Sequence, residues 1–171
     1  MMCISTKGRY ALRVVTFLAE WPGRPLTKTE ISEAEQVTPG YLQQIMGTLL
    51  SAGIVKSYRG KAGGFSLARD PETITVGEVL RCTEGRVEPV PCDDADECAR
   101  ADHCATRPFW LRVMRAVNEL LDSTTIADLL RDRDSEAAGL LLPGAPFLAG
   151  DKLDGAQRAH ANALPACSAR R

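Results

Sequence analysis

A glycine-rich basic stretch between two alternating segments constrains the fold of this chain more than any other feature. Residues 60–64 read Gly-Lys-Ala-Gly-Gly. The flanking segments, 54–59 and 65–69, alternate between apolar and polar residues as paired strands do. Glycine supplies the positive φ angles that tight hairpin turns require. The pattern therefore predicts a β-hairpin with a basic tip.

Three helices are predicted ahead of this hairpin. Residues 5–21 carry an apolar stripe at helical spacing, and we take Trp21 as its last member. A short second helix follows Thr27, which has Glu30 three residues later in the pattern of a capping box. The third covers residues 38–53, with an apolar face opposite an uncharged polar face.

Three helices followed by a basic hairpin are the element order of a winged helix-turn-helix, whose third helix enters the major groove of DNA. Residues 1–70 hold nine Lys/Arg and five Asp/Glu, whereas residues 71–171 hold twelve and seventeen. The net charge of −1 excludes a histone-like, uniformly basic protein, but the basic half suits a nucleic acid. We predict a mainly α fold with a small β-hairpin wing, and a DNA-binding domain over residues 1–83.

A long helix is predicted over residues 106–122, with an apolar set close to a heptad seam. Since no other long helix is predicted that could cover it, a second copy of the chain is the natural partner; the alternative is packing against the first helix. With a short last helix, residues 106–131 form the predicted dimerisation segment. Residues 132–171 are rich in Ala, Gly and Pro and are predicted to be a disordered tail.

Three of the six cysteines lie in a segment, residues 84–105, that has no helical or strand periodicity. A loop of this length in a compact domain needs something that orders it. No stretch matches a membrane span or a signal peptide, so we expect a cytoplasmic protein, in which thiols stay reduced. Metal or redox chemistry is therefore the leading explanation for Cys92, Cys98 and Cys104.

The spacing Cys-x5-Cys-x5-Cys favours an iron–sulfur cluster over zinc, because zinc ligands usually come in pairs two to four residues apart. A zinc site, a thiol–disulfide switch and inert thiols stay open as alternatives. Between Cys92 and Cys104 stand five acidic residues and one arginine, a charge that repels phosphate. We therefore expect this loop to face away from DNA.

An enzyme has little support in the sequence. The chain has two histidines, His103 and His160, and neither a phosphate-binding loop nor a nucleophile elbow. An electron carrier would need a cluster but no DNA-reading helix or basic wing. We therefore predict a regulator and not an enzyme.

The chain resembles the IscR-type iron–sulfur transcription regulators, whose relatives include the nitric-oxide-responsive NsrR proteins and the cluster-free CymR proteins. The matching strings are Ser-Thr-Lys-Gly-Arg-Tyr-Ala at 5–11, Gly-Tyr-Leu-Gln-Gln-Ile at 40–45 and Arg-Gly-Lys-Ala-Gly-Gly-Phe at 59–65, together with the three-cysteine loop. The resemblance covers about residues 1–131. It implies a homodimeric regulator, usually a repressor, that binds a palindromic operator and responds to iron–sulfur status, redox change or nitric oxide. A 2Fe–2S cluster is favoured, with 4Fe–4S as the other type.

The resemblance also implies the site residues. The three cysteines would hold the cluster, and the third helix and the wing would contact DNA through Thr38, Tyr41, Gln43, Gln44, Arg59 and Lys61. IscR has Glu at the position of Gln43, so base preference is expected to differ, since Gln suits adenine.

The fourth cluster ligand is the larger departure from the family pattern. IscR has a histidine three residues after the last cysteine, where this chain has Arg107, and a guanidinium is a poor ligand. His103 is our candidate for the fourth ligand. Asp102, Cys3, Cys82 and an external thiol are the alternatives.

Overall fold

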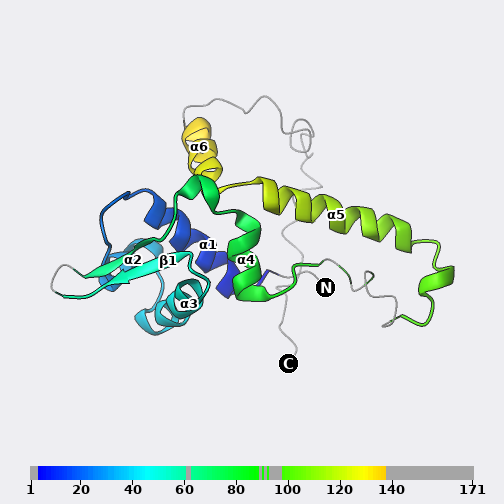
Figure 1. The fold of residues 1–171 in the computed structure, drawn as a ribbon, viewed down its shortest axis with the longest axis horizontal. Helices are drawn as coiled ribbons and strands as arrows, with labels where there is room; N and C mark the ends of the chain where they lie inside the picture. The colour runs from blue at the N-terminus through cyan, green and yellow to red at the C-terminus, as the bar shows by residue number, and fades with distance from the viewer. Residues whose placement is uncertain (1–3, 61–62, 89, 91, 93–97, 138–171) are drawn as a thin grey trace, which may run out of the picture. The chain divides into compact units, whose positions relative to one another are not determined.

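The computed structural model describes residues 4–60, 63–88, 90, 92 and 98–137 (Figure 1). Its contacts divide the chain into one unit, Met1–Arg133, and a second, Asp134–Arg171. In order, the elements are α1 (Thr6–Ala19), α2 (Lys28–Glu35), α3 (Pro39–Ser51), β1 (Val55–Tyr58), β2 (Gly64–Leu67), the 3₁₀ turn η1 (Pro71–Thr73), α4 (Val76–Glu84), the 3₁₀ turn η2 (Ala101–His103), α5 (Arg107–Ser123) and α6 (Ile126–Ala137). This is the predicted mainly helical fold with a β-hairpin wing. None of the described helices is long and apolar enough to cross a membrane.

The start of α2 is fixed by the predicted capping box. The Thr27 hydroxyl accepts from the Glu30 backbone N–H at 3.2 Å, and the Glu30 carboxylate accepts from the Thr27 N–H at 2.7 Å. The Glu30 carboxylate also accepts a hydrogen bond from the Thr27 hydroxyl at 2.8 Å, and the two hydrogen bonds that it accepts from Thr27 lower the pKa of Glu30 below its ordinary value. The helix ends at Gln36, whose φ of 52° makes the turn toward α3. Thr38 precedes α3 as predicted, but its side chain makes no capping hydrogen bond.

A single large core joins the three helices and the hairpin. Its fully buried side chains come from one face of each helix and from the segments that follow α3; the largest are Leu26, Ile31, Leu42, Ile45, Met46, Leu49, Ile54, Ile74 and Ile126. Trp21 was predicted to belong to the apolar stripe of the first helix, and this is wrong. The helix ends two residues earlier, so Trp21 lies in the following turn with 41% of its surface exposed.

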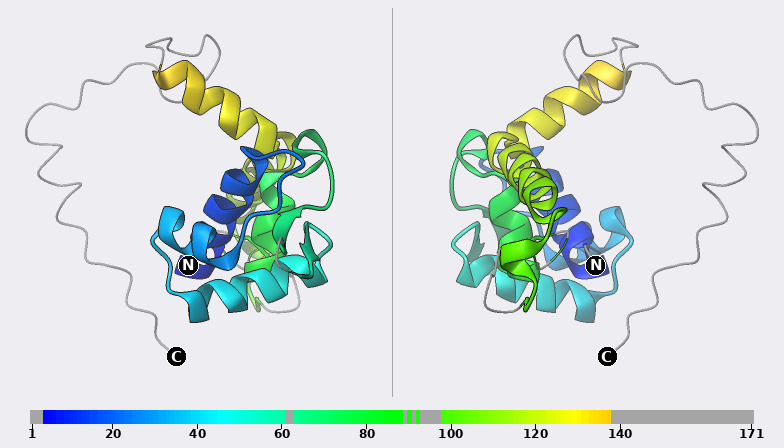
Figure 2. Two further views of the ribbon diagram at one scale, coloured as in Figure 1. Left: turned by 90° about the vertical axis from the view of Figure 1, so that its left-hand side faces the viewer. Right: turned by 90° about the vertical axis from the view of Figure 1, so that its right-hand side faces the viewer.

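A second, smaller cluster links the segment after α4 to four helices. Val87 is buried there against Val76 and Leu80 of α4, and half-buried side chains from α1, α5 and α6 complete it. α1 and α4 also lie side by side (Figures 1 and 2). The Ser5 hydroxyl donates to the Glu84 carboxylate at 2.5 Å, which ties the end of α4 to the start of α1. The cysteine loop therefore begins at a point anchored to the helical core.

The apolar stripe of α5 is divided between two faces. Met114 is buried and Leu121 packs on the second cluster, so this face of α5 contacts residues of its own chain. Leu120 is 66% exposed and Phe109 is 51% exposed. Together with Val113 and Ala116 they form a row at positions i, i+4, i+7 and i+11 of the helix, which we call the outer row.

α6 ends at Ala137 and is longer than the predicted last helix, which lay within residues 106–131. The added turns contain Arg, Asp, Ser and Glu, so they carry no apolar periodicity from which a helix could be recognised. The predicted tail, residues 132–171, lies outside the described residues from residue 138 onward.

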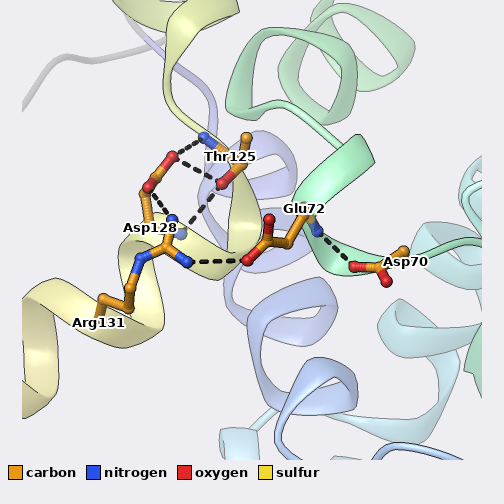
Figure 3. A network of polar contacts seen from close by, with 5 residues as sticks. All are labelled: Asp70, Glu72, Thr125, Asp128 and Arg131. Carbon is orange, nitrogen blue, oxygen red and sulfur yellow. Dashed lines mark hydrogen bonds and ion pairs between the residues drawn. The ribbon is translucent and has the colours of Figure 1, made fainter.

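A polar network fixes the start of α6 (Figure 3). The Thr125 hydroxyl donates to the Asp128 carboxylate at 2.6 Å and accepts from the Asp128 backbone N–H at 3.1 Å. Arg131 pairs with Asp128 and, at 2.9 Å, with Glu72 of η1. The Thr125 hydroxyl, the Thr125 backbone N–H and the Arg131 guanidinium lower the pKa of Asp128 to about 2.

This network predicts a small loss of stability in acid. Because the folded-state pKa of Asp128 lies below its ordinary value of 3.8, the contribution is complete above about pH 4 and disappears as the pH falls toward 2. The difference in unfolding free energy between the wild type and Asp128→Asn should follow this window in urea titrations. We expect less than about 1 kcal/mol, because solvent screens the pair. Thr125→Val keeps the carboxylate but removes the hydroxyl, so it should shrink the pH dependence; an undiminished dependence would contradict this account.

Candidate functional site

The outer face of α3 presents uncharged polar groups to solvent. Gln43 and Gln44 are exposed on it, and Thr38 is exposed just before its first turn. The opposite face, with Leu42, is buried in the core. Amide and hydroxyl groups of this kind can read base edges or bind phosphate oxygens.

Tyr41 differs from these residues, because its ring is half-buried. It meets Tyr10 of α1 edge to face, with ring centroids 6.1 Å apart. Arg13 lies 5.0 Å above the Tyr10 ring, and its guanidinium donates to the carboxylate of Glu35 at 2.8 Å and to the Glu35 carbonyl at 2.9 Å. The ring of Tyr41 therefore packs α3 against α1, and Arg13 joins α1 to α2.

The wing is an antiparallel hairpin in which Val55 pairs with Leu67 and Tyr58 with Gly64. Arg59 is exposed where the hairpin leaves β1, and Gly60 follows with a φ of 99°. Lys61, the other predicted wing cation, lies outside the described residues. Leu26 and Phe65 exchange two backbone hydrogen bonds of 2.8 Å, so the hairpin is attached to the start of α2. The wing and the helix-turn-helix are thus one body.

The cysteine loop leaves α4 at Gly85, whose φ is 78°, and enters α5 at Arg107. Cys92 and Cys104 are half-buried, whereas Cys98 is exposed. Arg107 Nε donates to the Cys92 carbonyl at 3.0 Å, and the Arg107 N–H donates to the Cys104 carbonyl at 3.2 Å. Arg107 therefore connects the first and third cysteines of the loop. Sequence reasoning considered this residue only as a missing ligand.

The surroundings of Cys104 favour ionisation of its thiol. Its Sγ lies 3.3 Å from the Thr106 hydroxyl. Hydrogen bonds from that hydroxyl and from the Thr106 and Arg107 backbone lower the pKa of Cys104. Cys82, by contrast, is half-buried on α4, and burial raises the pKa of its thiol.

The predicted ligands are not assembled into a metal site. In the part of the chain that the structure describes, no three His, Cys, Asp or Glu side chains lie close enough together to hold a metal ion. His103, the candidate fourth ligand, is exposed on η2. The residues between Cys92 and Cys98 lie outside the description. The donor chemistry suits a soft metal or a cluster, but ligation would have to draw the three sulfurs together.

The comparison with known proteins identifies the family. A family model described as Rrf2, iron-dependent transcriptional regulator, matches residues 4–132. The HTH-type transcriptional regulator CymR of Bacillus subtilis is 40% identical over 136 residues, which span 79% of this chain and 94% of that protein. The HTH-type transcriptional regulator IscR of Sodalis glossinidius is 31% identical over 134 residues, spanning 78% and 81%.

A solved structure agrees with this assignment. The structure of CymR, described as the global cysteine regulator of B. subtilis, superposes with a TM-score of 0.67 and 38% identity. The match covers 77% of this chain and 98% of that one. The resemblance to IscR-type regulators is thereby confirmed at the level of the family, and the chain is a DNA-binding regulator and not an enzyme. This chain belongs to the Rrf2 family of winged helix-turn-helix transcriptional regulators.

Proposed function

We propose that the protein is a homodimeric repressor whose affinity for a palindromic operator is controlled by an iron–sulfur cluster bound to Cys92, Cys98 and Cys104. The observation that carries the proposal is the position of the cysteine loop. It connects α4, which packs on the DNA-binding core, to α5, whose outer row is open to a second copy. A change in this loop can therefore alter how two DNA-binding domains are held.

The DNA-binding part of the proposal follows from the placement of α3 and the wing. Two copies would place their α3 helices in half-sites about one helical turn apart. Thr38, Gln43 and Gln44 would contact base edges or phosphates, and Tyr41 would offer its hydroxyl while its ring stays packed. Arg59 and Lys61 would contact the backbone or the minor groove.

The cluster part rests on the donors and on the family. Three thiolates suit iron–sulfur ligation, and the chain is similar in sequence to a relative named IscR. With three protein sulfurs, one further ligand is needed, and we propose His103. A cluster would supply a redox-active group that oxidants and nitric oxide can destroy. Arg107 would keep Cys92 near the start of α5 whether or not the cluster is present.

Visible absorption combined with iron and sulfide analysis tests the cluster directly. Anaerobically purified protein should be coloured and contain iron and sulfide in equal amounts, with about two of each per protomer for a 2Fe–2S cluster. Cys92→Ala should remove colour, iron and sulfide together. Cys167→Ala, which removes a thiol that is not among the candidate ligands, is the matched control and should keep all three.

The outcomes separate the proposal from its alternatives. A colourless protein that contains zinc, or that contains neither iron nor zinc, would reject cluster control. The relative named CymR is described as a cysteine regulator, so control without a cluster is the main alternative. In that case, DNA binding that changes when the thiols are oxidised would indicate a thiol–disulfide switch.

A further inference from the structure

Two large exposed aromatic residues lie together beside the base of the wing, where no proposed role accounts for them. The large apolar side chains exposed in the described residues are Trp21, Tyr58, Phe109 and Leu120. The last two belong to the outer row of α5. Trp21 and Tyr58, with 41% and 44% of their surfaces exposed, line the same hollow of about 250 Å³ between the α1–α2 turn and the hairpin. Exposed apolar groups gathered in one place indicate a binding surface.

Each of the two rings has a basic side chain close to it. Arg24 lies 4.8 Å above the Trp21 ring, and Lys56 Nζ lies 5.7 Å from the centre of the Tyr58 ring. Arg24 also pairs with Glu30 at 2.5 Å, and Arg69 of the same hollow pairs with Glu78. Lys56 is exposed, and no acidic partner for it is found among the described residues. Its positive charge is therefore available to a ligand.

Lys56 and Tyr58 lie on the same face of β1, and Arg59 follows the strand. Lys56 and Tyr58 are two residues apart on a strand, so their side chains leave the same face about 7 Å apart. Arg59 follows directly, at the tip of the wing. A DNA strand carries one phosphate every ~3.4 Å along the helix axis, so two donors about 7 Å apart can contact two phosphates of one strand. Contacts with Ser66 and with Lys56 lower the pKa of the Tyr58 phenol, whose hydroxyl can donate to a phosphate oxygen.

One acidic residue lines the hollow, and its carboxylate is held at the start of η1. This residue is Asp70, whose carboxylate accepts a hydrogen bond of 2.9 Å from the Glu72 backbone N–H and so caps η1. Since Leu26 and Phe65 attach the hairpin to the start of α2, the hollow moves with the DNA-reading helices as one body.

We infer that the DNA interface extends from the wing tip onto the base of the wing, where Lys56 and Tyr58 bind the phosphate backbone that flanks each half-site and Trp21 is covered by it. The inference rests on DNA binding by the family and is independent of the cluster. It implies a sequence-independent contribution to affinity in addition to base contacts from α3.

The salt dependence of binding to a random duplex, about two helical turns long, tests this inference without knowledge of the operator. Lys56→Ala should reduce the slope of log affinity against log salt by about 0.9 per protomer, because one phosphate contact is lost. Lys56→Arg keeps the charge and should keep the slope. Tyr58→Phe should weaken binding with no change of slope, since the hydroxyl is neutral.

Arg59→Ala is the benchmark, because it should lower the slope whether or not the base of the wing is used. A lowered slope for Arg59→Ala with an unchanged slope for Lys56→Ala would overturn the inference and leave DNA binding by the wing tip intact. A second readout uses Trp21, one of two tryptophans, in a Trp110→Phe background. Bound DNA should protect it from quenching by iodide, and equal quenching with and without DNA would also overturn the inference.

Discussion

Replacing Leu120 with aspartate should convert the proposed dimer into a monomer and lower operator affinity by about 10²–10⁴-fold. Leu120 is 66% exposed and lies on the outer row of α5 with Phe109, Val113 and Ala116. A charge buried between two apolar helix faces has no partner, so association becomes unfavourable. A monomer has one DNA-binding domain and contacts one half-site. It therefore loses the gain in affinity from binding two linked half-sites, which is typically about 10²–10⁴-fold.

Sedimentation or light scattering measures the oligomeric state, and fluorescence anisotropy measures DNA affinity. The matched control is Glu119→Ala, an exposed neighbour on α5 outside the outer row, which should leave both unchanged. Because Leu120 is largely exposed in the protomer, Leu120→Asp should leave the helical circular dichroism of the monomer intact. A dimer that persists in Leu120→Asp would place the interface elsewhere and revive packing of α5 within its own chain.

The first half of the fold could be predicted because its elements are marked by local signals. The capping pair Thr27 and Glu30, and Gly53 after α3, are short-range features that specify where a helix begins or ends whatever surrounds it. Trp21 was wrongly assigned to the apolar stripe of α1, because its spacing fits a helix although the backbone has already turned after Ala19. The extent of α6 was missed because its last turns are polar on all sides.

The cysteine loop shows the limit of sequence reasoning more clearly. Composition indicates that Cys92, Cys98 and Cys104 belong together, since their spacing is regular in a segment without other periodicity. Two features of the loop depend on contacts between distant residues: burial of Val87 among four helices, and the hydrogen bond from Arg107 to the Cys92 carbonyl. Arginine in a loop has many partners available to it, so no pattern in the sequence could select this one. Assembly of the proposed ligand set would likewise depend on an iron–sulfur cluster, which lies outside the chain.

Replacing Gly64 with alanine should lower the free energy of unfolding by about 1–3 kcal/mol and weaken DNA binding at the same time. A Cβ at this position would lie 2.4 Å from the Leu26 carbonyl oxygen and 2.7 Å from its carbon. That oxygen accepts the 2.8 Å hydrogen bond from the Phe65 N–H. The collision involves backbone on both sides, so no side chain can move to relieve it. The hairpin must separate from the start of α2, which shifts the wing relative to α3.

Gly47→Ala provides the matched control, because a Cβ there meets nothing within 4 Å on the outer face of α3. This change should stabilise the protein by about 0.5–1 kcal/mol, since alanine is the better helix former. Urea unfolding of both variants, compared with the wild type, should therefore give shifts of opposite sign. Both substitutions reduce the entropy of the unfolded chain to a similar extent. The difference between them thus measures the native-state collision at Gly64, and two stabilised variants would mean that the wing is not attached to α2 through the Leu26–Phe65 bridge.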